Sequence, residues 1–400
     1  SKNLVIYIII SFLKRFKVLL LFFFMCSIVL KNSASIFNHS DDNSVPIING
    51  ETLVNLLMYK NKIDELEDTK LWDRAKKFSN DYELIHLPNK RNKKDSIALY
   101  EPLSRSYFKM LEMIIDHELI NDTEKINICC LAEGPGGFIE CINNYRETKD
   151  RIVGITLKST NREIPGWKKS KNFLKNNQHI NITYGKDDTG DLYKLENIQY
   201  LKYMFNDECM LVTADGGFDF STDFNNQESM SYRIIFCEIV SALYLQKTGG
   251  HFVCKIFDIH TELTVKFLWI LSLCYGEVII TKPYTSRPAN SEKYIICKFF
   301  KGIEPEFLNK LFNLVKKWET TRNKLDFLNV PSDFISRINK YNELITNKQR
   351  DNIKMTLDII SNYESIEVTN SIIENQKVKA LSWCNNYNVE INENSSFLKQ

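Results

Sequence analysis

Between residues 101 and 300, short apolar runs alternate with segments of helical periodicity. The strand-like runs cover 126–131, 152–156, 210–213, 250–257, 277–280 and 294–299, and the helical segments cover 107–117, 137–145, 229–245 and 263–274. Strands this uniformly apolar are typical of a sheet that is buried on both faces, and intervening helices favour parallel strands. The pattern therefore predicts an α/β domain built on a doubly wound, mostly parallel sheet.

The flanks of this region show helical periodicity without strand-like runs. Apolar residues at three- and four-residue spacing over 51–58 and 63–78, and again over 306–318, predict helices on both sides. We therefore predict a helical extension at 46–100, a Rossmann-like domain at 101–302 and a helical C-terminal extension at 303–400. The basic run at 89–94 is by default a solvated loop, and its functional alternative is a patch that follows a phosphate chain.

Residues 1–45 have a different character. Two apolar runs, 4–13 and 18–30, are separated by Lys14, Arg15 and Lys17, and neither reaches the about 20 residues that a membrane-spanning helix needs. The segment is predicted to be an apolar leader or a weak membrane anchor, and both interpretations stay open. A start at Met25 would leave the preceding residues outside the native protein. Secretion is not favoured.

Composition excludes several classes of protein. With 44% hydrophobic and 26% charged residues in 400, the chain is globular rather than fibrous or disordered, and its net charge of +2 confines any nucleic-acid site to a local patch. The ten cysteines lie mostly within apolar runs and form no Cys-x-x-Cys pair, which is typical of reduced thiols in an intracellular protein. The six histidines are scattered, and we predict no metal site.

The candidate chemistry lies where predicted strands end, which is where doubly wound sheets bind ligands. The first strand runs into Glu133–Phe138, a glycine-rich turn that opens a helix and is neither a dinucleotide nor a Walker fingerprint. Asp215 follows the third strand and precedes two glycines, and its alternative interpretation is a turn-forming aspartate. Lys255 interrupts an apolar strand, which is costly unless the lysine is paired, functional or on a solvent-facing edge.

Seven segments together resemble the FtsJ-type RNA 2′-O-ribose methyltransferases, whose signature is a Lys-Asp-Lys-Glu tetrad. Within that group the chain is most similar to the enzymes specific for the mRNA cap, including versions carried by large DNA viruses. The segments occur in the same order over roughly residues 82–300, and no single one is specific. They are 104–110, 134–138, 154–158, 189–191, 214–218, 249–255 and 285–294.

The resemblance implies S-adenosylmethionine as cofactor and a role for each matching residue. The catalytic tetrad would be Lys109, Asp215, Lys255 and Glu292. The cofactor would be bound by Ser104, Gly134, Pro135, Gly136, Gly137, Phe138, Asp191 and Asp215, and the RNA by Asn225, Asn226, Gln227, Arg287 and Asn290. The chain departs from the family at Glu133, where a smaller residue is commoner, and in the segment before Lys109, which lacks an asparagine.

The residue types suit methyl transfer to a ribose. A 2′-hydroxyl is a poor nucleophile and the methyl donor is already activated, so alignment and removal of one proton are the main tasks. Lys255 is expected to deprotonate or polarise the hydroxyl. The role of base requires its pKa to be lowered by the apolar strand and by Lys109. Asp215 would orient Lys255, and Glu292 would orient Lys109.

The sequence therefore predicts a methyltransferase that converts the first transcribed nucleotide of capped mRNA to its 2′-O-methyl form. Two alternatives remain, an enzyme for internal riboses of ribosomal or transfer RNA and an inactive cap-binding subunit. The expected partners are the capped 5′ end and the capping or transcription machinery, with no stable membrane partner. The expected location is intracellular, either nuclear or cytoplasmic, with a viral factory or virion as the viral equivalent.

Overall fold

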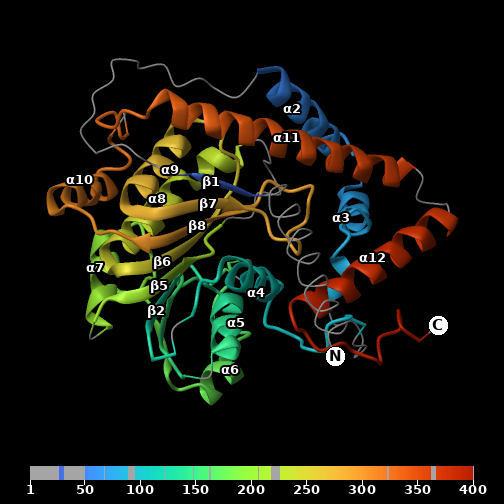
Figure 1. Ribbon diagram of the computed structural model, residues 1–400, viewed down its shortest axis with the longest axis horizontal. Helices are drawn as coiled ribbons and strands as arrows, with labels where there is room; N and C mark the ends of the chain where they lie inside the picture. The colour runs from blue at the N-terminus through green and yellow to red at the C-terminus, as the bar shows by residue number, and fades with distance from the viewer. Residues whose placement is uncertain are drawn as a thin grey trace, which may run out of the picture.

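The computed structural model describes residues 27–30, 50–66, 68–88, 95–121, 123–146, 148–161, 164–205, 207–217, 226–321, 324–361 and 366–399. Its centre is an eight-stranded sheet with the order β1-β7-β8-β6-β5-β2-β3-β4 (Figure 1). The parallel part contains β2 (Asn127–Leu131), β3 (Arg151–Ile155), β4 (Ile180–Thr183), β5 (Cys209–Ala214) and β6 (Gln246–Ile256). Antiparallel to β6 runs β8 (Lys293–Phe300), which also pairs with β7 (Tyr275–Thr281). The predicted mostly parallel sheet is confirmed.

Helices cover both faces, as a doubly wound fold requires. One face carries α4 (Ser106–His117), α5 (Gly137–Tyr145) and α6 (Lys171–Asn176), and the other carries α7 (Leu195–Tyr203), α8 (Gln227–Leu245), α9 (Glu262–Cys274) and α10 (Pro305–Lys316). The alternation of side chains along β2 shows why the strand is apolar throughout. Ile128 and Cys130 pack toward α4 and α5, whereas Cys129 and Leu131 pack toward α8 and α9.

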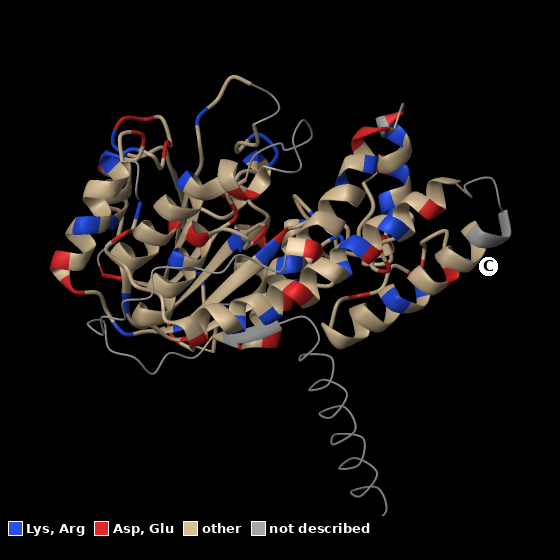
Figure 2. Cartoon of the chain, turned by 90° about the horizontal axis from the view of Figure 1, so that it is seen from above, with Lys and Arg blue, Asp and Glu red and all other residues tan. Residues whose placement is uncertain are grey.

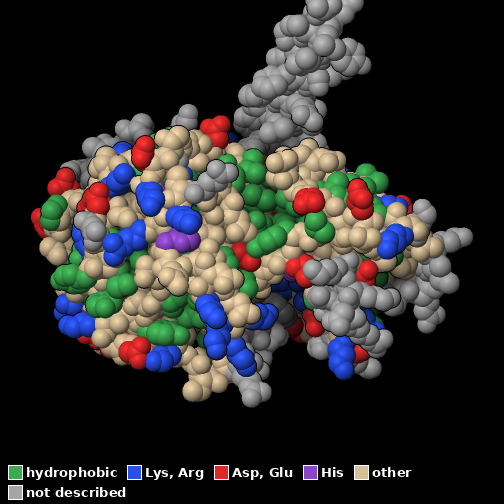
Figure 3. Space-filling view, turned by 90° about the horizontal axis from the view of Figure 1, so that it is seen from below, with side chains coloured by type: hydrophobic (Ala, Val, Ile, Leu, Met, Phe, Trp, Pro, Cys, Tyr) green, Lys and Arg blue, Asp and Glu red, His purple; other side chains and the backbone are tan. Residues whose placement is uncertain are grey.

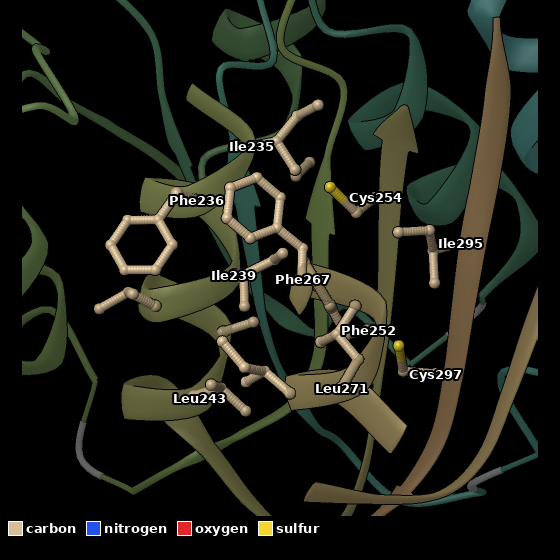
Figure 4. Packing of buried hydrophobic residues seen from close by; sticks show 14 of the residues in the cluster. Ile235, Phe236, Ile239, Leu243, Phe252, Cys254, Phe267, Leu271, Ile295 and Cys297 are labelled. Atoms are coloured by element: carbon tan, nitrogen blue, oxygen red, sulfur yellow. The ribbon is translucent and has the colours of Figure 1, made fainter. Parts of the chain in front are cut away.

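The core between α8, α9 and the sheet holds the strands that bear the candidate site. Phe236 and Ile239 of α8 meet Phe267 of α9, and together they pack over Phe252 of β6 and Ile295 of β8 (Figure 4). All five side chains are almost completely buried. Dense packing of this kind has little slack, so the ends of β6 and β8 are held in fixed positions.

The two extensions form one helical layer beside the sheet (Figures 1 and 2). The N-terminal part consists of α2 (Gly50–Asp64), α3 (Thr69–Phe78) and η1 (Glu83–Ile85), and the C-terminal part of α11 (Ser332–Ser361) and α12 (Ile366–Asn386). Gln376 of α12 donates to the carbonyl oxygens of Lys77 and Asn80 at 2.7 and 2.8 Å, and Thr356 of α11 contacts Ser79 at 2.7 Å. Segments almost 300 residues apart in sequence are thus joined.

Two strands were not predicted. The short β4 is partly exposed at the edge of the sheet, so it lacks the continuous apolar run of the inner strands. The other strand, β1 (Ser27–Leu30), lies inside the segment for which the pattern predicts a leader or anchor. It pairs antiparallel with β7. The rest of residues 1–45 and the basic run at 89–94 lie outside the described residues. Within the described part, no helix is both long and apolar enough to span a membrane.

Candidate active site

The glycine-rich turn lies directly after β2. Gly136 has a φ of +107°, which only glycine adopts without strain. A Cβ on Gly134 would come within 2.5 Å of the Pro165 carbonyl oxygen, and one on Gly137 would collide with the Ser104 and Ser106 hydroxyls. Gly134 and Gly137 therefore allow the turn to pack closely against other segments of the protein. The sequence had suggested that the glycines allow the backbone to approach a ligand.

The other predicted cofactor residues lie on the same edge of the sheet or pack behind it. The Ser104 hydroxyl contacts that of Ser106 at 2.5 Å beside the glycine turn. Asp191 follows β4 and caps its own loop by accepting from the Tyr193 amide at 2.8 Å. Phe138 has a fully buried side chain, so its contribution is packing. The turn, Asp191 and Asp215 thus follow the carboxyl ends of β2, β4 and β5.

The four predicted catalytic residues form two ion pairs close to each other. The Lys109 ammonium on α4 lies 2.6 Å from Glu292 Oε1, immediately before β8. The Lys255 ammonium on β6 lies 3.2 Å from Asp215 Oδ1 and donates to the Asp215 carbonyl oxygen at 2.7 Å. Their side chains retain only 13–18% exposure, which preserves access while limiting solvent screening.

Three further side chains hold these ion pairs in place. The Tyr294 hydroxyl donates to Asp215 Oδ1 at 3.1 Å, and the Ser286 hydroxyl donates to Glu292 Oε1 at 2.8 Å. The Lys282 ammonium donates to the carbonyl oxygens of Asn290 and Glu292 at 3.0 and 2.7 Å, and to the Asn290 side chain at 2.8 Å. Lys282 thereby fixes the loop that delivers Glu292.

The electrostatics of the site differ from the expectation for Lys255. Burial by itself lowers the pKa of Lys255, but the carboxylates of Asp215 and Glu292 outweigh burial and raise this pKa above its ordinary value. The prediction of a lowered pKa is therefore wrong for the cofactor-free protein, in which Lys255 is an ammonium. Burial and the Lys293 ammonium instead lower the pKa of Lys282 to about 7.

The ion pair between Lys109 and Glu292 should make the stability of the protein depend on pH. Burial opposes ionisation, yet the Lys109 and Lys255 ammonium groups lower the pKa of Glu292 from 4.5 to about 2. A lowered carboxyl pKa stabilises the fold above the unfolded value and loses this effect as pH falls. We expect the stability difference between the native protein and Glu292→Gln to shrink by about 3 kcal/mol between pH 5 and pH 2. Urea unfolding of both proteins across this pH range measures the difference in stability. A difference that does not change with pH would refute the ion pair between Glu292 and Lys109.

Three of the five predicted RNA contacts line one cavity of about 110 Å³ beside the tetrad. Gln227, Arg287 and Asn290 meet Lys60 and Trp72 of the N-terminal extension there. Its remaining lining residues are Ile63, Lys76, Ala289, Ser291, Gln349 and Ile353. Asn226 immediately precedes α8, and Asn225 lies outside the described residues. The cavity thus combines the apolar side chains of Ile63, Trp72, Ala289 and Ile353 with seven polar or charged residues.

Arg287 is partly engaged within the protein. Its guanidinium contacts both carboxylate oxygens of Glu83, at 2.8 and 3.2 Å, and its side chain remains 31% exposed. Glu83 belongs to η1 in the N-terminal extension and also lies 3.4 Å from Arg105, which precedes α4. This bidentate pair fixes the loop at residues 285–294 to the N-terminal extension.

Sequence reasoning missed several residues that organise the site. Lys60, Asp258 and Lys293 form a buried cluster behind the Glu292 loop, with Lys60 and Lys293 at 3.0 and 3.7 Å from the Asp258 carboxylate. Lys282 could have been noticed because it follows an apolar strand and precedes a proline. Lys60 carried no comparable signal because it lies on a polar helix 198 residues from Asp258.

The sheet order, the glycine turn after β2 and the paired ions at the carboxyl ends of β5 and β6 define a Rossmann-like enzyme domain. Residues 102–300 match the model of the FtsJ-like methyltransferase family, so this domain belongs to that family.

Curated relatives of the chain share one name, cap-specific mRNA (nucleoside-2′-O-)-methyltransferase 1. The Xenopus laevis protein is 29% identical over 305 residues, covering 70% of this chain and 34% of that protein. The Dictyostelium discoideum protein is 30% identical over 339 residues, covering 75% and 42%. A ribosomal RNA methyltransferase structure from Plasmodium falciparum has 18% identity and a TM-score of 0.36, over 50% of this chain and 99% of that one. The chain spans 34–42% of these curated relatives.

Proposed function

We propose that this chain is a cap-specific mRNA 2′-O-methyltransferase that acts on the first transcribed nucleotide and uses S-adenosylmethionine. The observation that carries the proposal is the pair of ion pairs, Lys109–Glu292 and Lys255–Asp215, at the carboxyl ends of the strands beside the glycine turn. The domain family supports methyl transfer, and the relatives' names support the cap as substrate.

The residues around the turn fit a small cationic cofactor. The backbone of the turn, Ser104 and Asp191 would hold it, with Asp215 near its reacting end. Glu133 contributes a buried carboxyl oxygen that has no hydrogen-bond partner among the described residues, which is a position suited to a positive ligand. When bound, S-adenosylmethionine supplies a methyl group on a positively charged sulfur.

Lys255 and Asp215 would control the reacting hydroxyl. Asp215 fixes the Lys255 side chain through both its carboxylate and its carbonyl oxygen, which leaves the remaining direction of the ammonium for the 2′-oxygen. For the 2′-oxygen to accept the methyl group its proton must leave, and the Lys255 amine would accept this proton. A cation beside Lys255 lowers the pKa of this lysine, so a bound methyl donor makes it a better proton acceptor.

The cavity lined by Gln227, Arg287 and Asn290 would hold the cap nucleoside. Trp72 and Ile353 provide apolar walls, while Lys76, whose side chain is 28% exposed, provides positive charge for the cap phosphates. Figure 3 shows one face of the molecule, on which Lys and Arg side chains lie in small groups among acidic and apolar ones and form no continuous basic surface. Local recognition of an RNA end suits such a surface better than binding along a duplex.

The proposal is tested by methyl transfer to matched RNAs with and without a cap. We expect transfer to the first ribose of capped RNA, and at least about tenfold less transfer to uncapped RNA because one well-buried recognition contact contributes this much. The position of the methyl group is mapped by nuclease digestion. Equal transfer to both RNAs would favour internal riboses, and RNA binding without transfer would favour an inactive subunit.

The proposed activity also implies where the protein works. Capped mRNA is made and used inside the cell, so we propose a nuclear or cytoplasmic location and the capping or transcription machinery as partners. Co-purification of the protein with a capping enzyme or RNA polymerase would support this partnership.

A further inference from the structure

Glu133 is a buried carboxyl group inside the glycine-rich turn. Its residue exposure is 2%, and its Oε1 atom accepts hydrogen bonds from the Phe138 and Ile139 amides at 2.7 and 3.4 Å. Its Oε2 atom is also buried but has no partner in the described part of the chain. One oxygen of this side chain therefore serves the first turn of α5, and the other is buried without a hydrogen-bond partner among the described residues.

The surroundings of Glu133 connect it to the tetrad. Leu131 of β2 pairs with Ala214 of β5, so the segments carrying Glu133 and Asp215 leave the sheet side by side. Burial, followed by the negative charge of Asp215, raises the pKa of Glu133, while Lys255 opposes the rise. The other ionisable groups that interact with it are Cys130, Cys141 and Tyr294.

We propose that Glu133 is the counter-ion for the sulfonium of the methyl donor. The proposal rests on the proposed function and adds a residue to its cofactor site. A positive charge within several ångströms of a buried carboxyl favours the carboxylate, so binding releases a proton. The demethylated product has an uncharged sulfur, so the carboxyl takes a proton back and product binding is weakened.

Glu238 is the strongest competitor for this role. It is also buried against Asp215 and Lys255, and burial raises its pKa to about 8. Both of its oxygens already have contacts, however, because Oε1 accepts from the Gly216 amide at 3.1 Å and Oε2 lies 3.7 Å from the Cys254 sulfur. An oxygen without a partner has more to gain from a bound cation, so we assign the role to Glu133.

The test is isothermal titration calorimetry at pH 7.5 in two buffers with different ionisation enthalpies. For the native protein we expect release of about one proton on binding S-adenosylmethionine and little release on binding S-adenosylhomocysteine. Glu133→Gln keeps an oxygen for the α5 amides but cannot ionise. It should abolish the release and reduce the preference for the donor over the product by about tenfold, the equivalent of one pKa unit.

Two matched variants separate this role from a structural one. Glu140→Gln alters another buried carboxyl on α5, whose oxygens are satisfied by Tyr100 and the Leu103 amide, and should leave the proton release unchanged. Glu238→Gln should also retain the release. Release that persists in Glu133→Gln, or disappears only in Glu238→Gln, would overturn the inference.

A measurement on the native protein covers the case in which Glu133→Gln does not fold. Because binding releases a proton, affinity for S-adenosylmethionine should rise with pH between 6 and 8, whereas affinity for S-adenosylhomocysteine should stay nearly constant. Equal pH dependence of the two affinities would contradict the proposed role of Glu133 but not the proposed function. Absence of binding of either compound would instead contradict the proposed cofactor and hence the proposed function.

Discussion

Replacing Lys255 with methionine is expected to reduce kcat for methyl transfer by about 10³-fold, within the range that a positioned proton-transfer group contributes. The change removes the ammonium that Asp215 holds at 3.2 Å while retaining an apolar side chain of similar length in β6. Binding of S-adenosylmethionine should change little, because the glycine turn and Ser104 are untouched. Single-turnover transfer to capped RNA measures the chemical step directly.

Controls distinguish loss of chemistry from loss of structure. Lys247→Met changes another lysine of β6, far from the tetrad, and should retain full activity. The pH dependence adds a second readout, because Lys255 is an ammonium in the empty protein. kcat/KM should show no inflection from Lys255 below the ordinary pKa of a lysine, whereas kcat should show one at lower pH once a cationic donor is bound. More than a tenth of native activity in Lys255→Met would refute the assigned role.

Replacing Asp258 with asparagine is expected to lower the free energy of unfolding by about 3–5 kcal/mol, the cost of breaking a buried ion pair by removing one partner. Asp258 lies 3.0 Å from the Lys60 ammonium and 3.7 Å from that of Lys293. The three side chains are only 3–6% exposed, so two buried positive charges would lose the carboxylate that lies between them. Their interaction also lowers the pKa of Asp258 well below its ordinary range, against the effect of burial.

A double variant and a surface pair test this explanation. Asp258→Asn combined with Lys60→Met removes one charge of each sign, and should recover part of the lost stability because Lys293 still donates to the Ser291 carbonyl at 2.7 Å. Asp188→Asn removes the partner of Lys158 in an exposed pair, and should change stability by at most about 1 kcal/mol. Urea unfolding monitors all of these variants. A small effect of Asp258→Asn alone would show that water reaches the cluster.

The N-terminal extension contacts the loop that carries Glu292 in two ways. Lys60 on α2 pairs with Asp258 just beyond β6, and Asp258 also lies 3.7 Å from Lys293, the residue after Glu292. Glu83 on η1 pairs with Arg287 of the same loop. The extension therefore supports the proposed active site, and a chain shortened to the family domain alone would lose these contacts.

The sequence determined the class of fold because local patterns dictate it. Continuous apolar strands such as β2 and β6, separated by helices, have one common solution in a doubly wound sheet. Asp215 and Lys255 stood out in the sequence because one follows and the other interrupts an apolar run, whereas Lys109 and Glu292 were assigned from the resemblance to the family. The edge strands β1 and β4 did not stand out, since short or half-exposed strands have weak patterns.

Only the tertiary structure decided how these residues interact. The sequence predicted a lowered pKa for Lys255 from its apolar strand. The carboxylates of Asp215, which follows β5, and Glu292, which precedes β8, instead raise this pKa. Lys60 and Asp258 meet across 198 residues, and one Glu133 oxygen is buried without a hydrogen-bond partner among the described residues. Charge interactions depend on distance and burial, and neither quantity is encoded by the local pattern of residues along a chain.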